Sequence, residues 1–303
     1  MNDRNDSDSV QNVAVSIGAV SRATGIAANT LRTWERRYGF PQPERSESGQ
    51  RVYDPAVIGH LRLVARALER GHRPKHVLTL PRPQLVELLE QVAQAPRTPT
   101  QGQDVTDWIS CTRRLDGAAL DNTFRQDLAR LGLLRFLSER SAAFLIAIGQ
   151  AWSDGELEVF QEHWASERLR RFLMETWEPL SHDATGPHVV ASTLPGDQHD
   201  LGLHMAVAVM AMCGWQIVFL GRDTPVEDIV AAASHQHARC ALVSISPWLD
   251  PDAVQDHLAD LAERVGDGVT VLAGGTGAPP DPPAGITTLS GLEALYAWAS
   301  QPG

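Results

Sequence analysis

Cysteine is scarce in this chain, since Cys111, Cys213 and Cys240 are the three thiols among 303 residues. Three widely separated cysteines exclude a disulfide framework and a cysteine-rich zinc site. The sequence also has no run of about 18 apolar residues, the length that a membrane-spanning helix needs. Its polar and acidic N-terminus lacks the pattern of a secretory signal. These absences predict a reduced cytoplasmic protein that is not embedded in a membrane.

The chain has fewer basic than acidic residues, and the basic residues are unevenly distributed along it. The net charge is −11 at pH 7. Residues 16–75 hold 11 Lys and Arg against 5 Asp and Glu, whereas the rest of the chain holds 15 against 32. A basic segment joined to an acidic body is typical of a nucleic-acid-binding module attached to a part that avoids nucleic acid. A chain of this length has room for two or three domains, each with its own core.

Composition and periodicity divide the chain into successive segments. Residues 1–14 are polar and are expected to form a disordered tail. A compact helical region follows over about residues 15–85, and the Pro-, Thr- and Gly-bearing stretch 95–103 is typical of a linker. Apolar residues at helical spacing continue through residues 104–180. Residues 186–303 form the last segment.

That last segment alternates short apolar strands with helices. Five strands with helices between them predict a doubly wound, flavodoxin-like parallel sheet. The expected strands are 189–194, 216–220, 241–245, 269–273 and 286–289, and the expected helices are near 201–213, 225–236, 251–265 and 291–299. The predicted fold class is therefore multidomain, with α-helical parts followed by an α/β domain of the Rossmann type.

The basic segment has the pattern of a DNA-binding head. A short helix ends in a Gly turn, and a second, arginine-bearing helix starts near Ala28. Two helices joined in this way form a helix-turn-helix, whose second helix enters the major groove of DNA. Residues 40–53 are expected to form a two-stranded wing. The run T-L-R-x-W-E-R-R-Y-G-x-P-x-P-x-R from Thr30, followed by G-x-R-x-Y to Tyr53, resembles the winged helix-turn-helix of MerR-type transcription regulators over about residues 15–80.

This resemblance implies that the head binds double-stranded promoter DNA, and it indicates which residues make the contacts. The helix would meet the groove and the wing would meet backbone phosphates. The implied contacts are Thr30, Arg32, Arg36, Arg37 and Tyr38 on the helix, and Arg45, Arg51 and Tyr53 on the wing. Trp34 and Tyr53 keep two open interpretations, because either aromatic ring also fits the core of the head.

A short loop after the first expected strand of the last segment carries the pattern of a ligand site. Asp197 stands two positions before His199, and Gly202 stands three positions after it. An imidazole there reaches out from the carboxyl edge of a parallel sheet, where open α/β sheets bind ligands. A nearby carboxylate fixes the tautomer of such a histidine and raises its basicity. D-x-H-x-x-G resembles the lower-ligand motif of cobalamin-binding domains, which implies that His199 is the lower axial ligand of cobalt.

Two further elements extend the resemblance to cobalamin-binding domains. Ser244-Ile-Ser246 ends the third expected strand and Gly274-Gly275 ends the fourth. They are similar to the S-x-L and G-G elements of domains that take cobalamin with the histidine on cobalt. In those domains the nucleotide tail of the cofactor lies in a slot of the sheet, so small residues line it. Ser246 stands where Leu is usual and still leaves a small side chain.

In the middle helical segment, Trp152 precedes the pair Glu162-His163 by ten residues. Alone, this pattern is ordinary for a core tryptophan and a surface Glu-His pair. Together with the head and the D-x-H-x-x-G loop, however, W-x(9)-E-H resembles the B12-dependent photoreceptor regulators of the CarH/LitR type. The resemblance implies a four-helix bundle that caps the upper face of adenosylcobalamin. In it Trp152 packs over the adenosyl group, Glu162 hydrogen-bonds the nucleoside, and His163 belongs to the same cofactor-binding set.

One position departs from the light-responsive members of that family. They carry a histidine directly after the tryptophan, and that histidine captures cobalt once the adenosyl group has left. Ser153 occupies the position here, and a serine hydroxyl is a poor replacement for an imidazole at cobalt. The form of any light response therefore depends on what Ser153 does at the upper face.

The leading interpretation is a transcription regulator, acting as a repressor and not as an enzyme. Bound adenosylcobalamin would hold a homo-oligomer, a dimer or a tetramer, that binds DNA, and light cleavage of the Co–C bond would change that assembly. A light-insensitive cobalamin or redox sensor, using another corrinoid form, is the alternative that Ser153 favours. A corrinoid methyl carrier is a third interpretation, against which the DNA-binding head argues.

Overall fold

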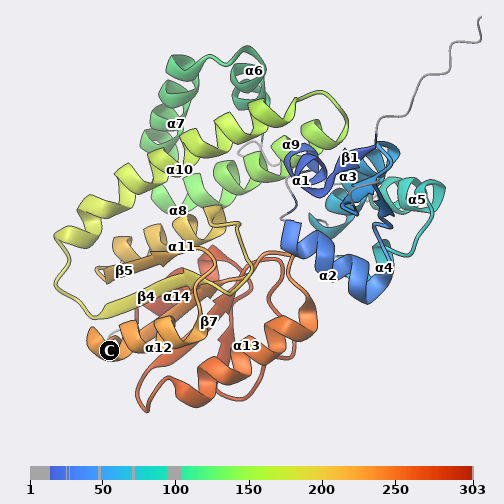
Figure 1. Ribbon diagram of the computed structural model, residues 1–303. Coiled ribbons are helices and arrows are strands. Elements are labelled where there is room, and N and C mark those ends of the chain that lie inside the picture. The colour runs from blue at the N-terminus through green and yellow to red at the C-terminus, as the bar shows by residue number, and fades with distance from the viewer. Residues whose placement is uncertain are drawn as a thin grey trace, which may run out of the picture.

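The computed structural model describes residues 14–24, 26, 28–46, 49–69, 72–93 and 104–301. Figure 1 shows three parts, with the blue head beside a green cap of helices and a yellow-to-red sheet part. We use "head" for residues 14–93, "cap" for residues 104–182 and "sheet part" for residues 183–301. The predicted linker, and all of the predicted tail except residue 14, lie outside the described residues.

The head is a helix-turn-helix with a small antiparallel sheet. The strand order is β1-β3-β2, and Val15 pairs with Tyr53. The wing predicted as two strands therefore has a third strand, which comes from the start of the head. Leu31 and Trp34 lie on the buried face of α2. The elements are β1 (Val15–Ser16), α1 (Ile17–Thr24), α2 (Ala28–Tyr38), β2 (Glu44–Arg45), β3 (Arg51–Tyr53), α3 (Ala56–Glu69), α4 (Pro74–Val77) and α5 (Arg82–Ala93).

The cap is a bundle of four helical stretches, and short polar motifs begin two of them. Asp116 caps α7 by accepting the amide of Ala119 at 3.0 Å. Glu158 and Gln161 form a capping box at the start of α10. A π-helical segment, η1, connects α8 to α9 within one stretch. The elements are α6 (Thr106–Arg114), α7 (Gly117–Leu131), α8 (Leu133–Arg135), η1 (Phe136–Ser141), α9 (Ala142–Ser153) and α10 (Val159–His182).

The sheet part is a five-stranded parallel sheet in the order β5-β4-β6-β7-β8. This is the flavodoxin-like order, so the predicted fold class is confirmed. Both faces are covered, which explains why strands such as β6 are buried along their whole length. The elements are β4 (His188–Thr193), α11 (Leu201–Met212), β5 (Gln216–Gly221), α12 (Val226–His235), β6 (Cys240–Ser244), α13 (Pro251–Arg264), β7 (Thr270–Gly274), β8 (Ile286–Thr288) and α14 (Leu292–Ala299).

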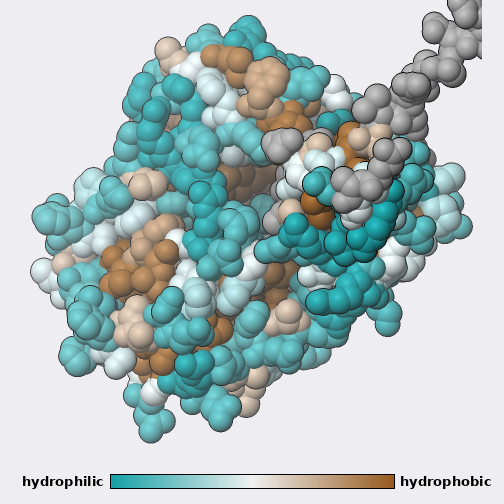
Figure 2. Space-filling view, viewed as in Figure 1, coloured by the Kyte–Doolittle hydropathy of each residue, from teal (hydrophilic) through white to brown (hydrophobic). Residues whose placement is uncertain are grey.

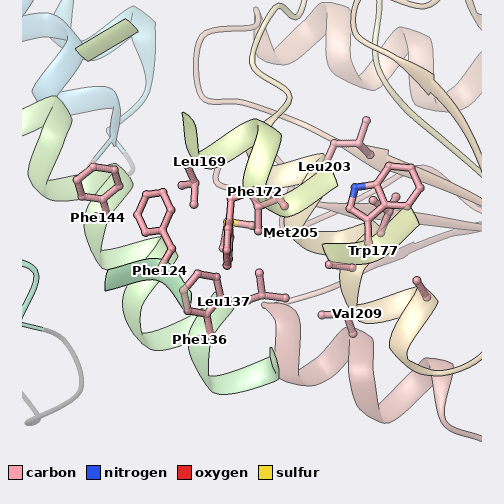
Figure 3. Close-up of a cluster of buried hydrophobic side chains, with 14 of the residues drawn as sticks. Phe124, Phe136, Leu137, Phe144, Leu169, Phe172, Trp177, Leu203, Met205 and Val209 are labelled. Carbon is pink, nitrogen blue, oxygen red and sulfur yellow. The ribbon is translucent and has the colours of Figure 1, made fainter. Parts of the chain in front are cut away.

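The cap and one face of the sheet share a single hydrophobic core. Figure 3 shows Phe124, Phe136 and Phe172 from the cap in the same cluster as Met205 and Val209 from α11. A second cluster fills the opposite face of the sheet, beneath α12 and α13. The head has a third cluster of its own. The cap and sheet part are therefore joined more closely to each other than either is to the head.

Candidate functional site

The loop that follows β4 holds the predicted pair Asp197 and His199. The side chain of Asp197 is fully buried, whereas 39% of the His199 side chain is exposed. Asp197 Oδ1 lies 3.0 Å from the backbone nitrogen of His199 and 3.2 Å from its Nδ1. Ser246 donates its backbone N–H to Oδ2 and its hydroxyl to Oδ1, each at 2.8 Å. Donors from two loops at one edge of the sheet therefore satisfy the buried carboxylate.

This arrangement sets the chemical state of the His199 ring. A carboxylate only accepts hydrogen bonds, so Nδ1 carries the proton and Nε2 keeps its lone pair. That is the tautomer in which an imidazole can ligate a metal through Nε2. Asp223, after β5, holds the same loop by accepting from the Gly196 amide at 2.6 Å and from Gln198 Nε2 at 2.8 Å.

Trp248 lies against His199, and sequence reasoning missed it. The two ring centroids are 5.5 Å apart and their planes differ by 16°, so the rings are stacked. Trp248 belongs to the loop after β6 that also carries Ser246. Its place after a strand, at the same sheet edge as His199, is the signal that would have found it. The stacked indole restricts the plane in which the imidazole lies.

The small residues predicted to line a slot lie together on one region of the sheet. Ser244 ends β6 and pairs with Gly274 at the end of β7. A β-carbon at Gly202 would lie 3.1 Å from Ser244 Oγ, whereas one at Gly274 would meet no atom within 4 Å. At Gly275, φ is +98° and a β-carbon would lie 2.4 Å from the carbonyl oxygen of Ile245. Glycine is thus required at 275, and the surface at 274 is open to an approaching group.

The predicted cap residues lie on two helices. Trp152, near the end of α9, is 6% exposed, and the guanidinium of Arg62 from the head lies 5.3 Å from its ring centroid. Glu162 and His163, in the first turns of α10, are hydrogen-bonded to each other, and this bond raises the pKa of His163. The structure therefore brings the Glu-His pair together and sets Trp152 against the head. The side chain of Ser153 lies outside the described part of the structure.

Two polar contacts that sequence reasoning missed fasten α10 to the sheet part. Nε of Arg170 donates to Oδ1 of Asp200 at 2.9 Å, and Asp200, directly after His199, is 5% exposed. Nε1 of Trp177 donates to Nδ1 of His204 at 3.3 Å. Burial lowers the pKa of His204 to about 4. No local pattern identifies these pairs, because each needs two elements to be brought together by the fold.

The predicted DNA contacts of the head are mostly at its surface. Tyr53 is the exception, being 1% exposed, and Trp34, whose interpretation was open, is 0% exposed; both rings belong to the cluster of the head. The Tyr53 hydroxyl lies 3.5 Å from Glu35, and its contact with phosphate stays a prediction. Arg32, Arg36, Arg37, Arg45 and Arg51 are exposed, and Thr30 and Tyr38 are half-buried.

Two of these residues contact the sheet part. Arg37 forms ion pairs with Asp250 and Asp252 at the start of α13. The Tyr38 hydroxyl donates to Asp250 Oδ2 at 3.1 Å. Burial and the neighbouring Asp250 carboxylate raise the pKa of Tyr38. Helix α2 therefore meets an acidic surface within its own chain.

Comparisons with known proteins support the predictions for the head and for the sheet part. A family model described as "MerR HTH family regulatory protein" matches residues 15–80, and one described as "B12 binding domain" matches residues 187–288. The chain is 27% identical to the HTH-type transcriptional repressor CarH of Myxococcus xanthus, over 86% of this chain and 89% of that one. It is 29% identical to the repressor CarA of the same organism, over 86% of each chain.

A solved structure supports the fold. The monomethylamine corrinoid protein of Methanosarcina barkeri superposes with a TM-score of 0.51 at 18% identity, covering 64% of this chain and 95% of that one. Among the described residues, no helix combines the length and the apolar character needed to cross a membrane.

The chain therefore joins a head that matches the MerR helix-turn-helix model to a sheet part that matches the B12 binding domain model. Its similarity to CarH and CarA over most of their lengths fits a regulator of the CarH type. The predicted head, α/β fold and cobalamin cofactor are confirmed at this level. The individual DNA-contacting and cofactor-binding residues stay predictions.

Proposed function

We propose that this protein is a transcription repressor that binds promoter DNA through its head and adenosylcobalamin between its cap and its sheet part. One observation carries the proposal: the buried Asp197 carboxylate lies 3.2 Å from Nδ1 of His199, at the sheet edge next to the cap, which favours the tautomer whose Nε2 is free to ligate a metal. The name "repressor" belongs to the relatives CarH and CarA, and we extend it to this chain.

The residues present fit a cobalamin bound through an imidazole. His199 would supply Nε2 to the lower face of cobalt. The open surface at Gly274, beside Ser244, suits the nucleotide tail of the cofactor. On the cap, Trp152 would shield the upper face from water, and the Glu162 carboxylate would accept from ribose hydroxyls. When bound, adenosylcobalamin supplies a cobalt–carbon bond that light breaks.

The proposed switch acts through the contact between the cap and the sheet part. These two parts share one core, and α10 is tied by Arg170 to Asp200, the neighbour of His199. A change at either face of the cofactor therefore shifts the packing of one helical bundle against one sheet. A ligand that favours one packing biases a two-state assembly, which is how the cofactor would control a homo-oligomer and its grip on DNA.

The test loads purified protein with adenosylcobalamin in the dark and then illuminates it with green light. Its ultraviolet-visible spectrum, size-exclusion profile and binding to promoter DNA are recorded before and after illumination. We expect dark binding of DNA by an oligomer, and a new spectrum, a smaller assembly and weaker DNA binding after light. A protein that takes up no cobalamin contradicts the proposal.

Ser153 favours a second candidate, a cobalamin or redox sensor that does not respond to light. A hydroxyl at this position does not replace the imidazole that captures cobalt in light-responsive relatives of this type. Under this candidate, illumination leaves the spectrum and the DNA binding unchanged. The Ser153→His variant is the matched comparison, since a light response that appears in the variant alone would assign the difference to this residue.

A further inference from the structure

The recognition helix α2 presents one face to the sheet part. Trp34, Arg37 and Tyr38 are three and four residues apart, so they share that face of the helix. Trp34 stacks on Trp248, with centroids 6.4 Å apart and planes 24° apart. Figure 1 shows α2 beside the loops at this edge of the sheet, and Figure 2 shows hydrophobic surface in the recess between the two. The contact thus combines an apolar centre with the polar pairs around it.

The polar pairs match those that the head would make with DNA. Arg37 is paired with two carboxylates, from Asp250 and Asp252, much as a guanidinium pairs with phosphate oxygens. Asp250 is 6% exposed, so its charge is held at the contact rather than in open solvent. A guanidinium held there is not available to phosphate. A helix packed against the sheet part is also unable to lie in a major groove about 12 Å wide.

The same docked head touches a residue beside each predicted face of the cofactor. Trp248, which stacks on Trp34, also stacks on His199. On the other side, Arg62 of α3 lies over the ring of Trp152. A single side chain, Trp248, therefore lies between Trp34 of α2 and the proposed cobalt ligand His199.

We propose that Asp250, Asp252 and Trp248 form an internal docking surface that mimics DNA for the recognition helix, and that cobalamin binding and head docking oppose each other. The proposal rests on the proposed function, in which α2 binds DNA and His199 binds cobalamin. In the docked state, Arg37 and Tyr38 are paired with the sheet part and cannot contact DNA. Occupation of the cofactor site rearranges Trp248 and Trp152, which releases the head. By linkage, anything that weakens docking strengthens the binding of DNA and of cobalamin alike.

The test compares the full-length chain with the double variant Asp250→Asn and Asp252→Asn. Asn retains the side-chain oxygen that caps α13, through which Asp250 now accepts from Asp252 N at 3.0 Å. The matched control changes Asp260→Asn and Glu263→Gln, which removes two charges from the same helix away from its start. Readouts are hydrogen exchange of α2, affinity for a labelled duplex of the protein's own promoter, and uptake of adenosylcobalamin in the dark.

We expect the docking variant to bind the duplex roughly 5- to 30-fold more tightly than the unaltered chain. Its α2 amides should exchange faster, and it should take up cobalamin more tightly, whereas the control should match the unaltered chain. Cobalamin added to the unaltered chain in the dark should itself speed exchange in α2.

Equal α2 exchange and equal DNA affinity in all three proteins would overturn the docking surface while leaving the proposed function in place. A chain that takes up no cobalamin, yet shows the exchange and DNA differences, would instead overturn the proposed function and the coupling to cofactor. In that case the docking itself stands. The exchange measurement needs neither ligand, so the two failures are distinguishable.

Discussion

Ser246 shows how a departure from a family pattern can be read from its contacts. A leucine is usual at this position in cobalamin-binding domains that resemble this one. Here the serine hydroxyl donates to Asp197 Oδ1 at 2.8 Å, beside the backbone N–H that donates to Oδ2. A leucine would keep the backbone N–H, but its side chain has no donor to offer to the buried carboxylate. The serine therefore adds to the forces that hold Asp197, and through it the ring of His199.

Replacing His199 with Ala tests the predicted ligand. Because the imidazole Nε2 would be lost from the lower face, we expect weaker cobalamin binding and a spectrum typical of a corrinoid without imidazole ligation. His235→Ala on the exposed surface of α12 is the control and should change neither. Titration with cobalamin, followed by absorbance, measures both quantities. An unaltered spectrum in His199→Ala would remove this residue from the cofactor site.

Sequence reasoning found the parts of this site whose residues are close together in the chain. Asp197 and His199 are separated by two positions, so their contact is a property of one loop. Trp248 and Arg170 were missed because each reaches the site from a distant element. Their side chains carry no spacing that marks them, and an isolated Trp or Arg fits a core or a surface equally well. The fold alone brings them to His199 and Asp200.

At the scale of elements, the π-helical segment η1 places a charged residue inside the cap. Arg140 is 5% exposed, and its Nε donates to Asp127 at 2.7 Å while its NH2 group donates to Asp107 at 2.9 Å. Its guanidinium also lies 4.9 Å from the ring centroid of Trp108. Trp108 in turn donates its Nε1–H to Asp127 at 3.1 Å. A periodic helical pattern predicts neither the π turn nor this network.

Replacing Asp127 with Ala should destabilise the cap strongly. The variant leaves Arg140 buried without its closest partner and leaves the Trp108 N–H unpaired. The expected loss is about 3–5 kcal/mol of unfolding free energy, measured by urea denaturation. The double variant Asp127→Leu with Arg140→Met removes both charges, so it should recover much of that loss. If the single and double variants are equally unstable, the charge network is not what the cap depends on.

The contact between α10 and α11 predicts a pH dependence of stability. Burial disfavours the charged form of His204 and lowers its pKa. Trp177 donates to Nδ1 of His204, so a proton added at Nδ1 would face an N–H group. The pKa of His204 is about 4 in the folded chain, against an ordinary 6.5. Between pH 4 and pH 6.5, the unfolded chain therefore binds a proton at His204 that the folded chain does not bind. The unfolding free energy is therefore highest above pH 6.5 and falls as the pH falls, by about 2 kcal/mol between pH 7 and pH 5.

His204→Asn isolates this contribution. The Asn oxygen can still accept from Trp177, but the side chain no longer titrates. Urea unfolding at pH 7 and pH 5 should show a smaller pH effect in the variant, while His235→Asn should keep the full effect. If the unfolding free energy depends on pH equally in His204→Asn and in the unaltered chain, His204 is not the source of the pH dependence.

At the scale of the whole molecule, the three hydrophobic clusters show which parts pack together. The cap and the sheet part share one cluster, to which the head adds Ala65, whereas the other buried residues of the head form a cluster of their own. Trp248 of the sheet part packs against the cluster of the head. The alternation of strands and helices and the helix-turn-helix were predictable because they follow from local periodicity and turn chemistry. The docking of the head was not, because its residues were assigned to DNA and nothing local showed a second partner.

A comparison of Arg36 with Arg37 distinguishes the binding of α2 to DNA from its docking on the sheet part. Both are exposed and both are predicted DNA contacts, but the ion pairs with Asp250 and Asp252 belong to Arg37. Each Ala variant should lower the dependence of DNA affinity on salt, by a log–log slope of about 0.9 for one lost phosphate contact. Arg36→Ala should therefore weaken DNA binding and leave cobalamin uptake unchanged.

Arg37→Ala removes a contact from the bound state and from the docked state together. Its net loss of DNA affinity should be smaller than that of Arg36→Ala, and its affinity for adenosylcobalamin in the dark should rise. Duplex titrations over a range of salt, and cobalamin titrations followed by absorbance, give both comparisons. Identical cobalamin affinities in the two variants would show that the head and the cofactor site are independent, whichever arginine is the stronger DNA contact.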